Sequence, residues 1–521
     1  MWLGWLGASR EKVELSTTTL VVSLSTCAVC CFLWVAKKTR KAVPPLPPGP
    51  RGLPLVGYLP FLGTELHRKF EELAGIYGPI YKVWLGQKLW VVVNSPSLVK
   101  EVVRDQDTTF ANRDPPIAAL VATYGGADIT FLPYGHEWKK LRKIFVREML
   151  SNAALDDSYT LRREQLRKGI RNVYEKIGTP IDVGQLAFVT LINGIMSLLW
   201  GDTLQGEEGA NIAVEFKGLL AEIMVLFAKP NVSDFFPGLA MFDLQGIERD
   251  AKSIFKWHER IFDSAIDMRL KYLAKAKEEG RGMTEQKKDF LQILLELRER
   301  DDAATSISMT QIKALLSFRS WFPENRKPDV LVGGSDTTTT MVEWVMAELM
   351  HHPEAMRRVH GELTEMVGLD CIVEESHLPK LNYLGAVIKE TFRLHPALPL
   401  LVPRSPSQSS TLVGIQDPKI WDNPLEFRPE RFLNDSGRLD YSGNDFDYLP
   451  FGSGRRICAG LPLAERMLIY VLASLLHQFE WELPPGTELD LSDRFGIVTK
   501  KRMPLVAIPT PRLSKLELYT T

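Results

Sequence analysis

The chain has 521 residues, with 63 Lys and Arg against 64 Asp and Glu, so its formal net charge at pH 7 is −1. This balance excludes a protein that binds nucleic acid through a strongly positive field. Three of its five cysteines share one apolar segment and the other two stand alone, so the sequence indicates neither a disulfide framework nor a cysteine zinc site. We therefore expect reduced thiols and no nucleic-acid partner.

The first predicted element is a membrane-spanning helix. Ser16 to Ala36 carries no charged residue and has the length of about 20 residues that a helix needs to cross a bilayer. Four positive charges follow in Lys37 to Lys41, and such charges keep their side of a membrane helix in the cytosol. A cleaved signal peptide is the alternative, but its charge bias is the reverse and no A-x-A site follows. A retained anchor is therefore favoured.

A proline-rich connector, Pro44 to Gly57, follows the anchor. Proline lacks the backbone donor that a helix interior requires, so we expect this connector to be non-helical. No internal repeat or low-complexity linker divides the rest of the chain. The predicted organisation is thus residues 1–41 as membrane anchor and basic stop, 42–57 as hinge and 58–521 as one large domain.

The patterns beyond the hinge predict a mainly α domain with small β-sheets. Pro79 to Pro96 has β-branched and aromatic residues on both sides of a Gly-Gln-Lys turn, which is typical of a hairpin. Apolar residues recur at helical spacing in EWKKLRKIFVREML, in QLAFVTLINGIMSLLW and from about Ile247 to Lys275. Lys275 to Asp289 is polar and is predicted to be a surface loop.

The stretch FGSGRRICAG, Phe451 to Gly460, places one cysteine among three glycines and two adjacent arginines. Helical spacing begins at Leu461, so Cys458 and Gly460 lie where a loop enters a helix. A cysteine at a helix N-terminus beside cations is biased towards the thiolate, which binds metals or attacks electrophiles. The sequence therefore marks Cys458 as a chemical centre.

A second motif, KETFRLHP, places Glu390 and Arg393 three residues apart on one helix face, where they can pair. An ordinary surface ion pair is one interpretation. A buried structural pair is at least as well supported, because the residues that follow are apolar. Arg431, in the loop FRPERF, is predicted to complete a charge cluster with this pair.

A third motif, VGGSDTTTTMVEW, puts Gly333 and Gly334 inside a helical pattern, where each weakens the helix by about 1 kcal/mol relative to alanine. Such glycines let a flat group approach the backbone or let the helix bend. Asp336 and Thr337 beside them supply an acid and a hydroxyl. The alternative is a simple helix start with Ser335 or Asp336 as N-cap.

Together these motifs resemble the cytochrome P450 haem-thiolate monooxygenases. FGSGRRICAG fits F-x-x-G-x-R-x-C-x-G, KETFR fits E-x-x-R, and FRPERF fits the arginine-containing loop between them. GGSDTT fits [AG]-G-x-[DE]-T-[TS], and EWKKLR, with Trp138 and Arg142, fits W-x-x-x-R. The sequences of the hinge and of the cysteine motif resemble those of the plant microsomal branch, which oxidises terpenoids, flavonoids and other phenolics. The resemblance implies the cytochrome P450 fold preceded by one N-terminal transmembrane helix.

The resemblance also implies haem, iron protoporphyrin IX, with Cys458 as the axial thiolate ligand to iron. It assigns Arg456 to a haem propionate, with Trp138, Arg142 and Arg404 assisting. Phe451 is expected to shield the sulfur, and Gly460 to let the loop pass close under the porphyrin.

Two further roles follow from the same resemblance. Asp336 and Thr337 are the expected catalytic residues, which organise protons and water where O₂ is split. Glu390, Arg393 and Arg431 are expected to be structural, stabilising the core that bears the haem.

The implied partners are O₂, a small apolar substrate, membrane lipid and a reductase. The sequence has no nucleotide-binding glycine loop, so electrons are expected from NADPH-cytochrome P450 reductase. The docking surface is expected near the basic residues Lys139, Lys140, Lys143 and Arg455. The expected location is the endoplasmic reticulum membrane, single-pass, with the catalytic domain facing the cytosol. The segments expected to set specificity are apolar and leave the substrate open: Ile117 to Gly126, Leu219 to Phe227 and Pro399 to Pro403.

The sequence departs from the family in two places. Ser317 to Pro328 interrupts the helical pattern that leads to the glycine–threonine motif, and its two prolines should break that helix. After Gly414 about a hairpin is missing, on the order of twenty residues. Two hypotheses therefore stand, a membrane-anchored monooxygenase and a catalytically impaired relative or mis-spliced form. An isomerase or dehydratase that uses haem without O₂ is disfavoured by the Asp336–Thr337 pair.

Overall fold

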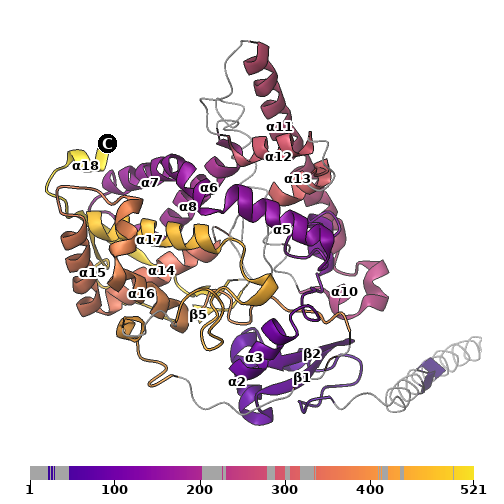
Figure 1. The fold of residues 1–521 in the computed structure, drawn as a ribbon. Coiled ribbons are helices and arrows are strands. Elements are labelled where there is room, and N and C mark those ends of the chain that lie inside the picture. The colour runs from indigo at the N-terminus through magenta and orange to yellow at the C-terminus, as the bar shows by residue number, and fades with distance from the viewer. Residues whose placement is uncertain are drawn as a thin grey trace, which may run out of the picture. The chain divides into compact units, whose positions relative to one another are not determined.

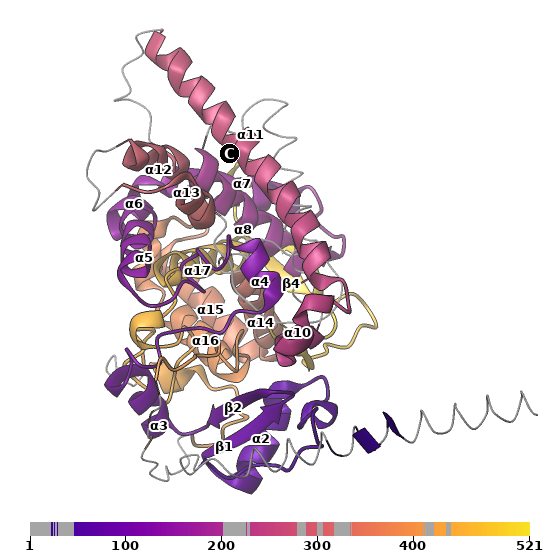
Figure 2. The ribbon, with the colours of Figure 1, turned by 90° about the vertical axis from the view of Figure 1, so that its right-hand side faces the viewer.

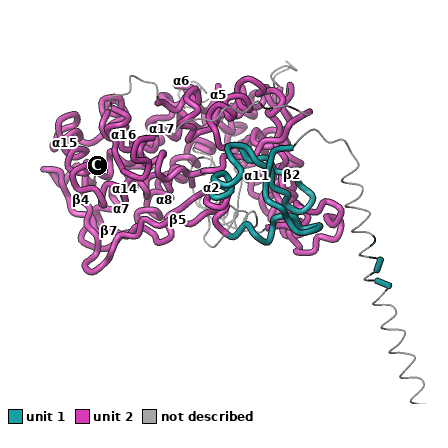
Figure 3. The backbone as a smooth tube through the Cα atoms, turned by 90° about the horizontal axis from the view of Figure 1, so that it is seen from below, with its two compact units in different colours: residues 1–63, 70–93 teal, residues 64–69, 94–521 magenta. Residues whose placement is uncertain are grey.

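The fold was analysed in a computed structural model. It describes residues 46–201, 230–278, 288–299, 306–316, 334, 336–408, 410, 412, 421–433, 439–496 and 498–520, and the isolated positions 22, 23, 25, 26, 29 and 226. The chain forms two compact units, residues 1–63 with 70–93 and residues 64–69 with 94–521 (Figure 3).

The first unit contains the predicted hairpin. Strands β1 (Ile80–Leu85) and β2 (Lys88–Val93) pair antiparallel, with Ile80 opposite Val93 and Leu85 opposite Lys88, so this prediction is confirmed. The short helix η1 (Leu59–Phe61) precedes them, and α2 (Leu66–Tyr77) begins in the second unit and ends in the first. Residues 46–57, the described part of the predicted hinge, contain no helix.

The second unit is mainly helical. Its helices up to the first motif segment are α3 (Pro96–Lys100), η2 (Glu101–Asp105), α4 (Ile117–Ala122), α5 (His136–Met149), α6 (Asn152–Asp157), α7 (Tyr159–Tyr174), α8 (Val183–Trp200), α10 (Val232–Phe235), η4 (Pro237–Phe242), α11 (Ile247–Glu278), α12 (Phe290–Arg298) and α13 (Met309–Leu316). Those that follow are α14 (Asp336–His351), α15 (Pro353–Met366), η5 (Glu375–Lys380), α16 (Asn382–Leu394), η6 (Pro429–Phe432), η7 (Gly454–Arg456), α17 (Leu461–Gln478) and α18 (Glu517–Thr520).

Two small sheets complete this unit. In one, the strands lie in the order β3-β7-β4, all antiparallel, and the other pairs β5 with β6. Their bounds are β3 (Ile181–Asp182), β4 (Phe479–Glu482), β5 (Asp493–Arg494), β6 (Lys500–Lys501) and β7 (Val506–Pro511). The prediction of a mainly α protein with small β-sheets is therefore confirmed.

The core of the second unit lies where α14, α16 and α17 pack on one another, with α8 and α15 against them (Figures 1 and 2). Trp344 of α14, Trp200 of α8 and Tyr470 of α17 are almost completely buried. The predicted helices correspond to α5, α8, α11 and α17. Because α14 begins at Asp336 and α17 begins three residues after Cys458, the packing of these two helices positions both residues.

Two boundaries bear on the sequence predictions. Helix α11 continues to Glu278, so the predicted loop begins later than Lys275. Helix α13 ends at Leu316 and α14 begins at Asp336. The predicted interruption, Ser317 to Pro328, lies outside the described residues, as do residues 413–420 on both sides of the predicted gap.

One helix in the described part of the chain is long and apolar enough to cross a membrane, namely α8, with a mean hydropathy of 1.6. Two thirds of it is buried inside the fold, as expected of a core helix. The predicted anchor, Ser16 to Ala36, lies outside the described residues except at positions 22, 23, 25, 26 and 29, which are helical and exposed.

Candidate haem-thiolate site

The cysteine loop is closed by its own backbone. The N–H of Cys458 donates to the carbonyl oxygen of Phe451 at 3.0 Å. Gly452 and Gly454 have φ of +71° and +67°, the left-handed region that favours glycine. A Cβ on Gly454 would lie 2.0 Å from the carbonyl oxygen of Val103, so no side chain fits there. The loop therefore needs both of these glycines, and Gly460 follows as the N-cap of α17.

Burial raises the pKa of the Cys458 thiol in the protein without a metal. Hydrogen bonds from the backbone N–H groups of Gly460 and Leu461 and the positive charge of Arg142 act in the opposite direction. Desolvation therefore outweighs the expected bias of Cys458 towards the thiolate. The sequence pattern did not indicate this desolvation. The N–H groups at the start of α17 still point at the sulfur, where they stabilise negative charge once a metal replaces the proton.

Arginines from distant segments gather beside this loop. Arg456 donates from Nε to the carbonyl of Ala111 at 2.6 Å, and its terminal nitrogens bind the carbonyls of Ile129, Thr130 and Leu132. Arg142 donates to the carbonyl of Ile457 at 2.7 Å, and Arg404 to that of Ser453 at 2.8 Å. Arg113 donates to the carbonyls of Val402 and Pro403. We call Arg113, Arg142, Arg404 and Arg456 the arginine cluster.

The arginine cluster carries more positive charge than nearby carboxylates balance. Burial, and then the charges of Arg404 and Arg142, lower the pKa of Arg456 to about 10. Burial likewise lowers the pKa of Arg404 to about 10, and the pKa of Arg113 falls well below its ordinary value through burial and through Arg404 and Arg456. The acids that favour the charged forms are Asp128 for Arg456 and Asp107 for Arg404. Such a cluster fits a guest that brings its own anionic groups.

An unpartnered donor supports the same fit. Nε of Arg113 is buried and makes no hydrogen bond to any residue that the structure describes, which costs free energy unless a ligand completes it. Together with a half-buried cysteine at a helix N-terminus, these residues suit an iron porphyrin with two carboxylates. Arg113 was missed by the sequence analysis, because an isolated arginine in FANRDPP carries no motif.

Trp138 supports the arginine cluster with its ring. Its Nε1 donates to the carbonyl of Ile129 at 2.9 Å, and the side chain is buried. The guanidinium of Arg456 lies 4.4 Å from the ring centroid and that of Arg142 5.4 Å, which is cation–π geometry. The structure therefore brings together three of the residues predicted to bind the cofactor.

The ring of Phe451 belongs to an aromatic group. Its ring centroid is 5.3 Å from that of Phe392 in α16 and 5.2 Å from that of Tyr441. Since its carbonyl accepts from Cys458, packing of this ring also fixes the position of the cysteine backbone.

Asp336 begins α14 and is almost fully buried. Its Oδ1 accepts a hydrogen bond from Nζ of Lys500 in β6 at 2.6 Å, and the side chain of Lys500 is 26 % exposed. Thr337 follows and is partly exposed, whereas Gly333 and Ser335 lie outside the described residues. Lys500 was missed by the sequence analysis, since nothing in TKKR indicates which lysine reaches an acid 164 residues away.

The structure brings Glu390, Arg393 and Arg431 into one buried network. Glu390 has no exposed surface, and its carboxylate accepts from Nε and a terminal nitrogen of Arg393 at 2.7 and 2.9 Å. It also accepts from the N–H of Arg428 at 2.8 Å and from Nε of Arg431 at 3.4 Å. Of the two interpretations of KETFR, the geometry supports the buried pair rather than the surface pair.

The basic residues expected at a docking surface come from α5 and the cysteine loop. Lys139 and Lys143 are exposed and Lys140 is partly buried. Arg455 is 44 % exposed and its Nε lies 2.8 Å from a carboxylate oxygen of Asp107. The three lysines are close neighbours of Trp138 and Arg142 along α5, and Arg455 directly precedes Arg456.

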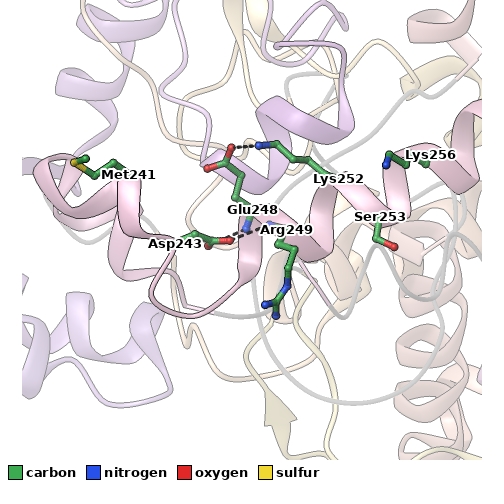
Figure 4. Close-up of a pocket in the computed structure, with 7 residues that line it drawn as sticks. All are labelled: Met241, Asp243, Glu248, Arg249, Lys252, Ser253 and Lys256. Carbon is green, nitrogen blue, oxygen red and sulfur yellow. Dashed lines mark hydrogen bonds and ion pairs between the residues drawn. The ribbon is translucent and has the colours of Figure 1, made fainter.

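A separate depression lies at the start of α11 (Figure 4). It is open and mostly polar, and none of the predicted site residues lines it. Its lining residues are Met241, Asp243, Glu248, Arg249, Lys252, Ser253 and Lys256. We assign it no part in the haem-thiolate site.

The segments expected to set specificity are only partly described. Ile117 to Gly126 comprises α4 and the turn after it, and Pro399 to Pro403 precedes Arg404. Leu219 to Phe227 lies outside the described residues except for Leu226, which is buried.

Comparison with known proteins agrees with this geometry. The model of the family described as Cytochrome P450 matches residues 47–416 and 415–507, two pieces that meet just after Gly414. A flavonoid 3'-monooxygenase from Crocosmia x crocosmiiflora is 36% identical, with 93% of this chain and 98% of the relative covered. The carnosic acid synthase of Salvia fruticosa is 35% identical, covering 94% of this chain and 99% of the relative.

The fold matches solved structures as well. A zebrafish cytochrome P450 solved with progesterone has a TM-score of 0.67 and 25% identity, covering 85% of this chain and 99% of that one. Another structure, with abiraterone, has a TM-score of 0.66 at 24% identity and covers 86% and 99%. The family's cofactor is haem with an axial thiolate, which the cysteine loop and the arginine cluster suit. The chain belongs to the cytochrome P450 family and is a monooxygenase that resembles plant hydroxylases.

Proposed function

We propose that this monooxygenase hydroxylates a small apolar molecule of the flavonoid, terpenoid or other phenolic class, with electrons from NADPH-cytochrome P450 reductase. The observation that carries the proposal is the position of Cys458 at the start of α17, in a loop that the arginine cluster contacts. The similarity to a flavonoid 3'-monooxygenase and a carnosic acid synthase, each over more than nine tenths of the chain, supports the substrate class.

The chain's own residues divide the work. Cys458 binds the iron, and the backbone N–H groups of Gly460 and Leu461 stabilise the charge on its sulfur. The arginine cluster pairs with the porphyrin carboxylates, and Trp138 holds two of its guanidiniums. When bound, haem supplies the centre at which O₂ receives two electrons and two protons, so that one oxygen atom enters a C–H bond and the other leaves as water.

Protons have a route through the residues of α14. The carboxylate of Asp336 is buried, whereas Lys500, which contacts it, is partly exposed. Asp336 can thus relay protons between Lys500, which reaches solvent, and Thr337. Glu390, Arg393 and Arg431 act structurally, because their hydrogen bonds join α16 to the loop around η6.

The remaining proposals concern location. We assign residues 1–41 to a single-pass anchor in the endoplasmic reticulum membrane, 42–57 to the hinge and 58–521 to the catalytic domain facing the cytosol. The exposed Lys139 and Lys143, with Arg455, support docking of an acidic reductase surface on this face of α5.

The carbon monoxide difference spectrum of the dithionite-reduced full-length chain tests the function. A strongly red-shifted Soret band is expected, and Cys458→Ser should abolish it. Cys371→Ser is the matched control, since Cys371 is also a free cysteine but is exposed, and it should keep the band. Absence of the band from the unmodified chain would refute the proposal and favour the impaired relative, which the comparisons do not support. Substrate class is then tested by spectral titration with flavonoids against diterpenoids.

A further inference from the structure

The contact between Asp336 and Lys500 depends on the register of β6. Successive side chains of a strand point to opposite faces, so a slip of one residue would turn Lys500 away from Asp336. The hairpin pairs only two residues from each strand, Asp493 with Lys501 and Arg494 with Lys500. Arg494 and Lys500 are like charges directly opposite each other, which weakens the pairing. The hairpin by itself therefore holds this register poorly, and other contacts must fix it.

Lys501, the second residue of β6, is buried against α14. It is only 4 % exposed, and a lysine is almost never buried without partners. Its Nζ donates to the carbonyl oxygen of Asp490 and lies 4.8 Å from the centroid of the Trp344 ring in α14. Burial lowers the pKa of Lys501, whereas the carboxylates of Glu343, Asp490 and Glu348 act in the opposite direction. These contacts hold the ammonium, and with it β6, at one place on α14.

Trp344 offers Lys501 a fixed surface. The tryptophan has no exposed surface, and the ring of His395, just after α16, stacks on it with centroids 3.8 Å apart and planes inclined by 5°. Nε2 of His395 lies 2.6 Å from a carboxylate oxygen of Glu348, one turn further along α14. Since His395 covers one face of the indole, Lys501 lies over the other, where the ring attracts a desolvated cation. The position of the ring is therefore set before Lys501 binds to it.

The backbone on both sides of Lys501 is attached to α14 as well. Nε1 of Trp344 donates to the carbonyl of Thr499 at 3.5 Å. Oε1 of Glu343 accepts from the backbone N–H of Leu505 at 2.8 Å. Burial raises the pKa of Glu343, but a carboxyl oxygen accepts this bond in either protonation state. We call residues 499–505 the clip, because they are fixed on α14 before, at and after Lys501.

We propose that Lys501 is a positioning residue for the reaction: its ammonium on Trp344 fixes the clip in the register that brings Lys500 to Asp336. Neighbouring side chains of β6 point to opposite faces, so Lys501 acts on Asp336 through Lys500. The inference rests on the proposed function for the part that Asp336 plays in proton delivery. The attachment of the clip to α14 depends only on contacts within the chain.

Acylation of lysines by an activated ester, read residue by residue by mass spectrometry of the full-length protein, tests the inference without substrate. Only the unprotonated amine reacts, so the ion pair with Asp336 protects Lys500. Asp336→Asn breaks this pair and should raise the rate at Lys500 about tenfold, which sets the upper limit. Lys501→Met fills a similar space without charge and should raise the rate most of the way to that limit. Lys501→Arg keeps a cation on the ring and should leave the rate unchanged.

The matched control is a lysine over another aromatic ring. Nζ of Lys389 in α16 lies 5.8 Å from the centroid of the Tyr441 ring, so Lys389→Met removes a comparable contact. It should leave the acylation rate at Lys500 unchanged. If Lys501→Met fails to fold in urea unfolding, Lys501→Gln takes its place, since its amide can still donate to the carbonyl of Asp490.

Turnover of the haem-loaded protein separates positioning from a structural role. With a flavonoid that binds in the spectral titration, Lys501→Met should lower kcat and leave KM and the carbon monoxide band unchanged. Turnover of this variant should also slow more in D₂O, because proton delivery then limits the rate. Lys501→Arg should restore both. A purely structural role would instead weaken the carbon monoxide band or raise KM.

The outcomes separate failure of this inference from failure of the proposed function. An unchanged rate at Lys500 in Lys501→Met, with the higher rate present in Asp336→Asn, would overturn the inference even if the carbon monoxide band is present. An unchanged rate in Asp336→Asn would overturn it too, since Asp336 would then not hold Lys500. Absence of the carbon monoxide band refutes the proposed function, whatever the acylation rate at Lys500.

Discussion

Removal of the charge of Glu390 should destabilise the protein strongly. The carboxylate has no exposed surface, and the side chains of Arg393 and Arg431 beside it are 7 % and 6 % exposed. Breaking a buried ion pair by removing one partner costs about 3–5 kcal/mol, because the remaining charge is left uncompensated. Both arginines also donate to backbone carbonyls, Arg393 to Pro424 for example, which offsets part of the loss. We therefore expect Glu390→Gln to lower the free energy of unfolding by about 3 kcal/mol.

Urea unfolding of the full-length chain, followed by tryptophan fluorescence, measures this loss, since urea does not screen charges as a salt does. Glu426→Gln is the matched control. That carboxylate is 50 % exposed and lies 3.8 Å from Arg431, so its loss should cost less than about 1 kcal/mol. If Glu390→Gln lowers the free energy of unfolding by no more than Glu426→Gln does, the Glu390–Arg393 pair behaves as a surface ion pair. The reasoning from burial would then be refuted.

Three further predictions concern the cysteine loop, the arginine cluster and pH. Gly454→Ala should lower the free energy of unfolding in urea by more than about 2 kcal/mol, because its Cβ meets a backbone oxygen of η2 in addition to the cost of left-handed backbone. Gly452→Ala has open space around its Cβ and should lower the free energy of unfolding by only about 1–2 kcal/mol. Equal losses in the two variants would contradict the steric argument. Arg113→Gln should speed transfer of haem to apomyoglobin about tenfold or more, since a buried charged donor is lost, and an unchanged rate would remove Arg113 from the site. Burial and a neighbouring arginine and histidine lower the pKa of His360 to about 4. The unfolded chain therefore binds more protons between about pH 6.5 and 4, and stability should fall by up to about 3 kcal/mol as pH drops through that window. Thermal unfolding of His360→Gln should show a correspondingly weaker pH dependence, and a slope equal to that of the unmodified protein would exclude this histidine as the cause.

The role of Lys500 shows how a sequence motif is completed from elsewhere. Asp336 and Thr337 are adjacent in the chain, so their pairing needs no fold. The cation that contacts Asp336 comes from β6, and it is also the part of the pair that reaches solvent. The position of the Asp336 carboxylate therefore depends on the C-terminal hairpin of β5 and β6 as well as on α14.

The local features of this protein were readable from its sequence. The hairpin of β1 and β2, the helices α5, α8, α11 and α17 and the spacing of Glu390 and Arg393 depend on residues close in the chain, where backbone geometry alone sets periodicity. The five motifs identified the family for the same reason, since each is contiguous.

Only the tertiary structure decided which distant residues contact these motifs. Burial of Cys458 raises its pKa against the local bias towards thiolate, and desolvation depends on atoms brought from the whole fold. Arg113 joins Pro403 across 290 residues, and Tyr124 reaches Glu259 across 135. Contacts at such separations are selected by how the helices pack, so no pattern within a single segment encodes them.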